Sequence, residues 1–275
     1  MKSTTEHNDK FDTHNLRLLR VWDEIQCIQT DFCFLQEASA YYMSDYWVRN
    51  VQSVLDVGTG NGYYLSKLIE RFPEKQYTGI DISQELIDMA KSRLANFDVQ
   101  LKAQDYFTTT GIYDFVIMRL FWQHLPQNRI REALDKLREI THPDSSVLII
   151  DAFDEARRFV PDLPELRKVI AAYSQQQKTI GRNREIIKVL IDWASTANKS
   201  WQLGCDIFLF MPSTITGYLQ LYKRIYELWI ELFECLGELE IDLTPVKQEL
   251  SEWRENDHAF TQAGLHIIRL DRLSQ

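Results

Sequence analysis

The residues best suited to chemistry stand in one short stretch, Val54 to Gly62, which reads VLDVGTGNG. An aspartate, Asp56, is followed by glycines at three alternating positions, Gly58, Gly60 and Gly62. Because glycine has no Cβ, the backbone can turn sharply here and pass close to a ligand. Amide groups exposed at such a turn, and at the start of the helix after it, can meet polar ligand atoms. The stretch therefore predicts a strand, a glycine turn and a helix that bind a nucleotide-like ligand.

Two further acids stand where the next two strands are expected to end. Residues 76–82, which read QYTGIDI, form a short apolar strand that contains Asp81, and the strand expected over 99–103 is followed by Asp105. Asp81 comes 23 residues after Gly58, the expected place for a carboxylate that accepts hydrogen bonds from both hydroxyls of an adenosine ribose. The alternatives are that Asp81 merely ends a strand and that Asp105 is a solvated loop acid.

The register of the glycines separates two classes of nucleotide-like ligand. A dinucleotide fingerprint, G-x-G-x-x-G, would need glycine at position 63, where this chain has Tyr63. An acid two places before G-x-G-x-G instead resembles motif I of the class I S-adenosylmethionine-dependent methyltransferases, and ISQELIDMAKSRL at 82–94 resembles their second motif region. The resemblance covers residues 51–153 well and the remainder only in general layout. It implies S-adenosylmethionine as the methyl donor and S-adenosylhomocysteine as the product.

The same resemblance implies which residues contact the cofactor. At Asp105, a carboxylate can accept from the exocyclic amine of adenine while the backbone N–H of Tyr106 faces a ring nitrogen. Arg119 lies either near the methionine carboxylate of the donor or in a salt bridge outside the site. The contacts implied along the first two strands are made by Asp56, Gly58, Thr59, Gly60, Asp81 and Ile82.

A histidine follows the expected fourth strand. The string RLFWQHLP at 119–126 resembles the segment after motif IV in many small-molecule methyltransferases, and the alignment of motifs places His124 near the methyl donor. An imidazole there can accept a proton from a substrate hydroxyl or amine. The favoured alternative is structural, since in this family the histidine often only holds the loop by hydrogen bonds. Trp122 of the same segment is a candidate for substrate contact.

The elements that must position these residues follow from the apolar pattern. Helices are expected over 63–71 and 84–96, the second beginning after Ser83 as N-cap, and Pro126 suits the start of a helix over 127–140. Continuous apolar runs at 113–120 and 146–153 suit parallel strands that are covered on both faces. Relatives usually enter the latter strand through a proline and paired glycines, whereas this chain has HPDSS at 142–146, a change expected to affect only a distal turn.

Two helices are expected before the first strand, over 16–36 and 38–49, and residues 1–13 are expected to be disordered. Since ligands bind beyond the carboxyl ends of parallel strands, this helical segment can fold across that opening as a lid. Its second helix is rich in aromatic residues. Packing in the core is expected for Tyr46 and Trp47, whereas Tyr41 and Tyr42 are open between packing and substrate contact.

The C-terminal part is expected to combine helices at 163–173 and 183–197 with strands at 205–211 and 264–270. In the family the last strand runs antiparallel to its neighbours. Between these strands, residues 214–236 carry apolar side chains over an arc of roughly 200°, wider than one sheet face requires. The part of this arc that the sheet does not cover could pack on the lid helices, on a second subunit of a homodimer or on an apolar substrate. Packing on the lid is favoured, because apolar helix faces are most often covered within their own chain. Tyr218 and Tyr222 are candidates for substrate contact.

Length and composition limit the function classes. The 275 residues, 45% of them hydrophobic, suit one folding unit with a tail and lid at 1–50, a cofactor core at 51–154 and a cap-bearing remainder at 155–275. A net charge of -9 without a basic run disfavours a nucleic-acid partner. No export signal or long apolar span is found, which predicts a cytoplasmic protein without a membrane partner. The four cysteines form no C-x-x-C motif and are expected to be buried, reduced and metal-free.

Together these features predict an α/β protein with a doubly wound, mostly parallel seven-strand sheet, the Rossmann-like methyltransferase fold, carrying an N-terminal helical lid and a C-terminal helical insertion. The predicted activity is transfer of the methyl group of S-adenosylmethionine to an O, N or C nucleophile of a small molecule, an apolar or aromatic metabolite. Two alternatives stay open. One is a protein or peptide methyltransferase, and the other is a non-catalytic protein that binds S-adenosylmethionine.

Overall fold

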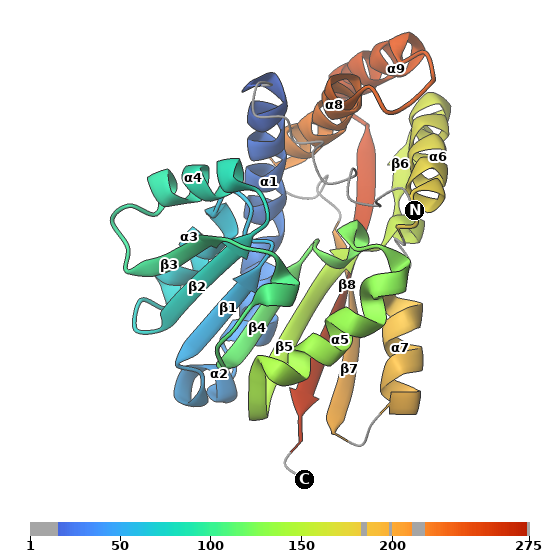
Figure 1. The fold of residues 1–275 in the computed structure, drawn as a ribbon. Helices are drawn as coiled ribbons and strands as arrows, with labels where there is room; N and C mark the ends of the chain where they lie inside the picture. Colours follow the sequence, from blue (N-terminus) through green and yellow to red (C-terminus); the bar gives the residue numbers. More distant parts are fainter. Residues whose placement is uncertain (1–15, 183–185, 198–199, 211–217, 274–275) are drawn as a thin grey trace, which may run out of the picture.

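A mostly parallel sheet with helices on both faces forms the centre of the molecule (Figure 1). The computed structural model describes residues 16–182, 186–197, 200–210 and 218–273; the predictions for residues 1–13 and for the first residues of the helices at 183 and 214 lie outside them. The strands are β1 Ser53–Val57, β2 Gln76–Asp81, β3 Val99–Ala103, β4 Tyr113–Arg119, β5 Thr141–Ala152, β6 Arg158–Val160, β7 Trp201–Phe210 and β8 Phe260–Arg272.

The strand order confirms the predicted doubly wound sheet. Strands β3, β2, β1, β4 and β5 lie side by side and parallel, and β8 then pairs antiparallel with β5 on one side and with β7 on the other. These seven strands make up the expected sheet. The three-residue β6, which the sequence did not predict, pairs with the start of β8.

The helices account for the remaining elements. The α-helices are α1 Leu16–Glu37, α2 Asp45–Asn50, α3 Tyr63–Arg71, α4 Gln84–Arg93, α5 Ile130–Glu139, α6 Pro164–Thr179, α7 Ile186–Ala197, α8 Tyr218–Leu236 and α9 Thr244–Glu255. Short helical turns stand at Ala38–Tyr42 (a π-turn), Tyr106–Thr108, Trp122–His124, Gln127–Arg129 and Asp154–Ala156. As predicted, the Ser83 hydroxyl caps α4 by accepting from the backbone N–H of Leu86 at 3.2 Å.

The helix expected over 127–140 begins as α5 only at Ile130, and the one expected over 163–173 continues to Thr179. Two further helix predictions differ more from the structure. The helix expected over 38–49 is divided, because Ser44 adopts an extended conformation and its hydroxyl accepts from the backbone N–H of Trp47, which starts α2 as a separate helix. Helix α9 was not predicted. It packs against α6 and α8, and its buried residues are only Val246, Leu250 and Trp253.

The wide apolar arc of α8 is covered within the chain. Helix α8 packs along α1, where the rings of Phe32 and Tyr222 lie 4.6 Å apart, and its other side meets β6 and α9 through Tyr226, Phe159 and Trp253. The residues concerned belong to one buried cluster. Lid packing, the favoured prediction, is therefore correct. The homodimer stays a prediction, but a second subunit is not needed to cover the apolar side chains of α8.

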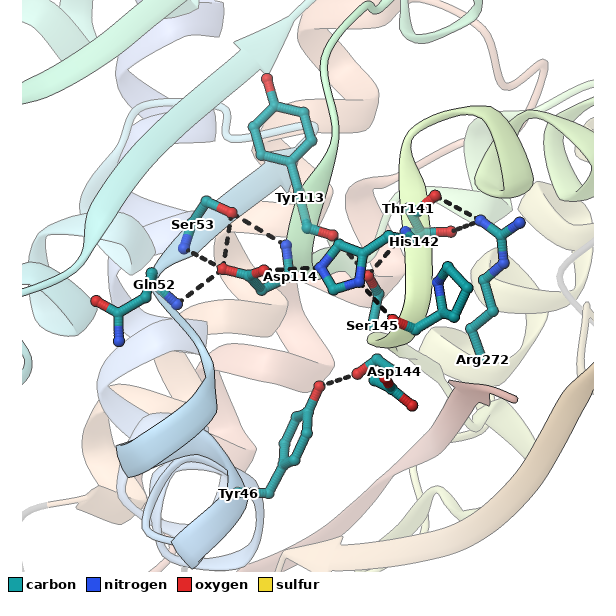
Figure 2. A network of polar contacts seen from close by, with 11 residues as sticks. Tyr46, Gln52, Ser53, Tyr113, Asp114, Thr141, His142, Asp144, Ser145 and Arg272 are labelled. Carbon is teal, nitrogen blue, oxygen red and sulfur yellow. Dashed lines mark hydrogen bonds and ion pairs between the residues drawn. The ribbon is translucent and has the colours of Figure 1, made fainter. Parts of the chain in front are cut away.

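The amino-terminal ends of three strands are joined by polar contacts (Figure 2). One carboxylate oxygen of Asp114, in β4, accepts from the backbone N–H of Gln52 and from the N–H and hydroxyl of Ser53 in β1, at 2.8 to 2.9 Å. The other oxygen lies 2.8 Å from Nε2 of His142 in β5. Hydrogen bonding to Asp114 raises the pKa of His142, whereas its hydrogen bonds hold the pKa of Asp114 below its usual value despite partial burial. The HPDSS segment, which the sequence predicted to be a turn before the strand, is instead the first part of β5, and His142 ties it through Asp114 to β4 and β1.

Several composition-based predictions can be compared with the described residues. All four cysteines are free, as expected, but only Cys33 is buried, while Cys27 and Cys235 are partly exposed. Cys205 is exposed because it lies in the mid-part of β7, where several successive residues face solvent. Within the described ranges, no cluster of three or more His, Cys, Asp or Glu side chains suits a metal ion, and no helix has the length and apolar character needed to cross a membrane.

Candidate functional site

The glycine turn connects β1 with α3 at the carboxyl ends of the parallel strands. All three glycines have positive φ, +73° at Gly58, +55° at Gly60 and +74° at Gly62, a conformation that residues with a Cβ rarely adopt. A Cβ on Gly62 would lie 2.9 Å from that of Ala90, so this glycine also lets α3 approach α4. The turn is held by hydrogen bonds from the N–H groups of residues 58 and 59 to the carbonyl of Ile80, both at 2.9 Å.

Asp81 ends β2 directly beside this turn. Its carboxylate accepts from the backbone N–H of Gly60 and from that of Ser83, each at 3.0 Å, so that both oxygens are oriented. Burial raises the pKa of Asp81, against the effect of these hydrogen bonds. Each oxygen keeps a lone pair for a ligand hydroxyl. The next residue, Ile82, is 63% exposed, and an apolar side chain left in solvent beside an acid offers a surface to a flat ring such as adenine.

Asp105 and Tyr106 follow β3 as the sequence predicts. The backbone N–H of Gln104 donates to the carbonyl of Asp81 at 2.8 Å, which joins the ends of β2 and β3. The Asp105 carboxylate caps a helical turn by accepting from the N–H of Phe107 at 3.0 Å. Tyr106 is buried, and its hydroxyl donates to the carbonyl of Ala133 at 2.8 Å. A ligand could therefore use the backbone of Tyr106, as predicted, but not its side chain.

Asp56 lies under the glycine turn, at the end of β1, and is 2% exposed. Among the described residues, neither its Oδ2 nor the hydroxyl of buried Thr59 makes a hydrogen bond of good geometry, although the two groups lie near enough for the hydroxyl to favour the charged carboxylate. Burial raises the pKa of Asp56 to about 6, although the Thr59 hydroxyl and the Arg119 guanidinium act in the opposite direction. Buried polar atoms of native proteins normally have partners. These two atoms, under a turn that admits no Cβ, fit the polar end of an adenosine-containing ligand.

Arg119, at the end of β4, is paired with the lid helix. Its Nε lies 3.4 Å from Oε1 of Glu37, and its Nη2 donates to the carbonyl of Gln29 at 3.2 Å, both on α1. The guanidinium also stacks over the ring of Tyr64, at 4.9 Å from its centroid. Of the two predictions for Arg119, the salt bridge is present; it is buried, and the guanidinium acts electrostatically on the carboxyl group of Asp56.

Helix α1 crosses the glycine turn and is fastened there by polar side chains. Oε1 of Gln26 accepts from the backbone N–H of Asn61 at 2.9 Å, and the Asn61 amide donates to Asp23 at 2.6 Å. Arg93, from α4, donates to the same carboxylate at 2.9 Å and to the Asn61 carbonyl at 2.7 Å. Sequence reasoning missed these residues, because the only signal was that Asn61 stands inside the glycine turn.

His124 stands in the turn that follows β4. It is exposed, and its ring meets that of Trp22 on α1 edge-on, with centroids 6.3 Å apart. The backbone N–H of Gln123 donates to Oδ2 of Asp151 in β5 at 3.1 Å, which holds this turn. The structure therefore brings the candidate base under the lid helix. Trp122, in contrast, is fully buried in the main core, so its ring fills space between the sheet and α5 and offers no surface to a substrate.

The candidate substrate tyrosines do not gather at one place. Tyr41 donates to Asp206 of β7 at 3.0 Å. Tyr42 is fully buried, with its hydroxyl 2.8 Å from that of Tyr64, and packs among core aromatic rings. Tyr222 is buried at the contact between α1 and α8. The side chain of Tyr218 lies outside the described part. Tyr42 and Tyr222 are thus packing residues in this structure.

Residues 54–144 match the family described as "Methyltransferase domain". A malonyl-[acyl-carrier protein] O-methyltransferase of Anoxybacillus flavithermus is 24% identical over 164 residues, which are 52% of this chain and 63% of that protein. One of the same name from Bacillus cytotoxicus is 33% identical over 30% of each chain, and a release factor glutamine methyltransferase of Streptococcus pneumoniae is 40% identical over 24% of each. The chain matches less than two thirds of the length of each of these relatives.

Solved structures share the fold over nearly the whole chain. A plantazolicin methyltransferase in complex with SAH has a TM-score of 0.56 at 15% identity, with 97% of this chain and 93% of that chain covered. A second structure of the same enzyme with a desmethyl-plantazolicin analogue and SAH has a TM-score of 0.55 at 15% identity, with the same coverage. The resemblance to class I S-adenosylmethionine-dependent methyltransferases is therefore confirmed for residues 54–144, and the predicted fold is confirmed for the chain.

Proposed function

We propose that this class I methyltransferase transfers the methyl group of S-adenosylmethionine to an O, N or C nucleophile of a small apolar or aromatic acceptor. One observation carries the proposal. Three acids, Asp56, Asp81 and Asp105, end or follow three adjacent strands around one glycine turn, within the segment that matches the methyltransferase family. This arrangement supports binding of an adenosine through its ribose and base while its polar end lies over β1.

The chain's own residues then have separate tasks. Asp81 accepts from the ribose hydroxyls, because its oxygens are already oriented by Gly60 and Ser83. Asp105 and the backbone of Tyr106 are proposed to meet the adenine, and Ile82 its face. Asp56 and Thr59 supply the unpartnered polar atoms at the other end. When bound, S-adenosylmethionine supplies a methyl group activated by a sulfonium charge, so positioning and exclusion of water can provide most of the catalysis.

His124 is the proposed proton acceptor. As the acceptor atom forms its bond to the methyl carbon, the bond from that carbon to sulfur breaks, and an O–H or N–H nucleophile must also lose a proton. The imidazole of His124, next to Trp22 of the lid, can take that proton. An acceptor that reacts as an anion needs no base. In that case His124 would only hold its turn beneath α1.

The surroundings of the strand ends support a small acceptor. Helix α1 lies over the glycine turn and is itself packed against α8, so the site is roofed by two helices. The ring of Trp22 on α1 faces His124, whereas Phe32 and Tyr222 pack between α1 and α8 and hold the two helices together. A large protein substrate would need an open cleft, whereas an apolar or aromatic molecule gains most from such surroundings.

A second candidate is an acceptor carried on a protein or peptide. It is favoured by the names of the relatives, which include malonyl-[acyl-carrier protein] O-methyltransferase and release factor glutamine methyltransferase. Those names describe the relatives, each of which is similar to about half of this chain or less. The roof of α1 and α8 lies largely outside the segment that matches the family, and acceptor choice is proposed to reside there.

Two measurements test the function. Isothermal titration should show binding of S-adenosylmethionine and S-adenosylhomocysteine but not of NAD; tight binding of NAD would overturn the cofactor assignment. Cell extract is then incubated with the protein and methyl-labelled donor and separated by size. Label in the small-molecule fraction is expected, and label retained on protein would favour the second candidate. If the donor binds but no S-adenosylhomocysteine forms with any extract, a non-catalytic binding protein is the better description.

A further inference from the structure

Glu37 is a buried acid for which the methyltransferase motifs assign no role. It is the last residue of α1, and none of its surface is exposed. Its Oε1 faces Nε of Arg119 at 3.4 Å, a long contact for an ion pair, and its Oε2 has no hydrogen-bond partner among the described residues. Oδ2 of Asp56 likewise makes no hydrogen bond of good geometry to the described residues. Two buried carboxylates thus each keep one unused oxygen near a single guanidinium.

The charges of this cluster do not balance. Arg119 interacts electrostatically with both Glu37 and Asp56, and the buried hydroxyl of Tyr42 is influenced by both carboxylates. The hydroxyls of Tyr42 and Tyr64 are 2.8 Å apart, and Cys33 supplies only a thiol whose pKa burial raises further. With both acids ionised, Glu37, Asp56 and Arg119 together carry one net negative charge inside the protein. An uncompensated buried charge costs several kcal/mol.

We propose that Glu37 and Asp56 together receive the ammonium group of the methionine part of S-adenosylmethionine. The inference rests on the proposed function and extends it to a residue of the lid helix. A primary ammonium has three donors and one positive charge, which matches two unpartnered carboxylate oxygens and one missing charge. Arg119 is paired with Glu37, and its strand β4 is the direct neighbour of β1, which carries Asp56.

This subsite would connect cofactor binding with closure of the lid. Asp56 belongs to the sheet, whereas Glu37 belongs to α1, the helix that Gln26 and Asp23 fasten across the glycine turn. A cation shared by the two carboxylates attracts α1 towards the sheet. Glu37 is therefore a positioning residue, because it places the donor and the helix that roofs it.

The test compares ligands that differ in the ammonium group. The variant Glu37→Gln keeps the size of the side chain and removes its charge. Its affinity for S-adenosylhomocysteine and for decarboxylated S-adenosylmethionine, which both carry the ammonium, should fall about 10- to 100-fold by isothermal titration. Its affinity for methylthioadenosine, which lacks the amino-acid part, should equal that of the wild type. Retained binding of methylthioadenosine also shows that the variant is folded.

The matched control is Glu24→Gln on the same helix, whose carboxylate pairs with Arg224 of α8 at 3.0 Å, and it should change none of these affinities. Equal losses for all three ligands in Glu37→Gln would overturn the inference and make Glu37 a residue that supports the fold. No loss for any ligand would also overturn it, while leaving the proposed function intact. If the wild-type protein binds none of the ligands, the proposed function fails and the inference with it.

Discussion

Asp56 and Asp114 lie in neighbouring parallel strands, β1 and β4, but near opposite ends of the sheet. Asp114, near the amino-terminal ends, has four polar partners from Gln52, Ser53 and His142, and its pKa is lowered (Figure 2). Asp56, at the carboxyl ends, keeps an unpartnered oxygen, and burial raises its pKa to about 6.

The difference shows how one sheet serves two purposes. A carboxylate whose hydrogen-bonding capacity is filled by the chain joins strands and stabilises the folded state. A buried carboxylate with an unused oxygen weakens the free protein and can recover that free energy when a ligand supplies the missing donor. The amino-terminal end of the sheet is therefore expected to control stability, and the carboxyl end to control binding.

The largest expected effect is on binding at the carboxyl end. Asp81→Ala removes the carboxylate that is proposed to accept hydrogen bonds from two ribose hydroxyls. Because hydrogen bonds to a charged group are strong, the substitution should weaken binding of S-adenosylhomocysteine by about 3 to 4 kcal/mol, several-hundred-fold. Isothermal titration measures the change. Asp114→Ala serves as the control and should bind as tightly as the wild type. A similar loss of affinity in both variants would mean that the two ends of the sheet are not separable.

The next effect is a pH-dependent cost at Asp56. Its folded pKa, about 6, exceeds the ordinary value of 3.8, so the folded state disfavours the charged form, and the stability of the free protein should fall as pH rises from about 4 to about 6. The loss should approach about 3 kcal/mol. Asp56→Asn should remove this step in urea unfolding. Arg119 and Asp81 also face this carboxyl group, so the step remaining in the variant reports Asp81, whose pKa burial likewise raises.

At the opposite end, Asp114→Ala should lower the free energy of unfolding by about 2 kcal/mol. The substitution leaves the N–H groups of Gln52 and Ser53 without their acceptor in a partly buried place. Urea unfolding at pH 7 measures this loss. Unchanged stability would show that water replaces the carboxylate fully. The amino-terminal end of the sheet would then not control stability as expected.

The smallest effect belongs to His142. Its pKa is raised by Asp114, so its charged form stabilises the fold fully below the unfolded pKa, and this contribution disappears as pH rises through the folded pKa. Because the ring is 41% exposed, the contribution should stay below about 1 kcal/mol. His142→Ala should therefore destabilise the protein more at pH 5.5 than at pH 8. The exposed His258→Ala is the control, and an equal loss at both pH values would assign His142 to packing alone.

Local pattern was enough to find most of the elements. Helix α3 and strand β3 have the predicted bounds, and Ser83 caps α4, because each depends on residues within one turn or one strand. The glycine turn and Asp81 were equally accessible, since their spacing is set by a single strand-turn-helix unit and the strand after it. Trp122 and Tyr222 were candidates for substrate contact but are buried, and Tyr42, which the sequence left open between packing and substrate contact, packs in the core. Aromatic residues near a site can equally fill the core, and only packing decides between the two.

The sequence by itself determined the strand-turn-helix core, the order of its three acids and the presence of helices before the first strand, because these follow from periodicity and short-range spacing. The tertiary structure decided which distant charges meet. Glu37 and Arg119 are 82 residues apart, and Asp114 and His142 are 28 apart, yet each pair is in contact. Such long-range contacts decide whether the oxygens of a carboxylate are hydrogen-bonded within the chain or left free for a ligand. No local sequence pattern records these contacts.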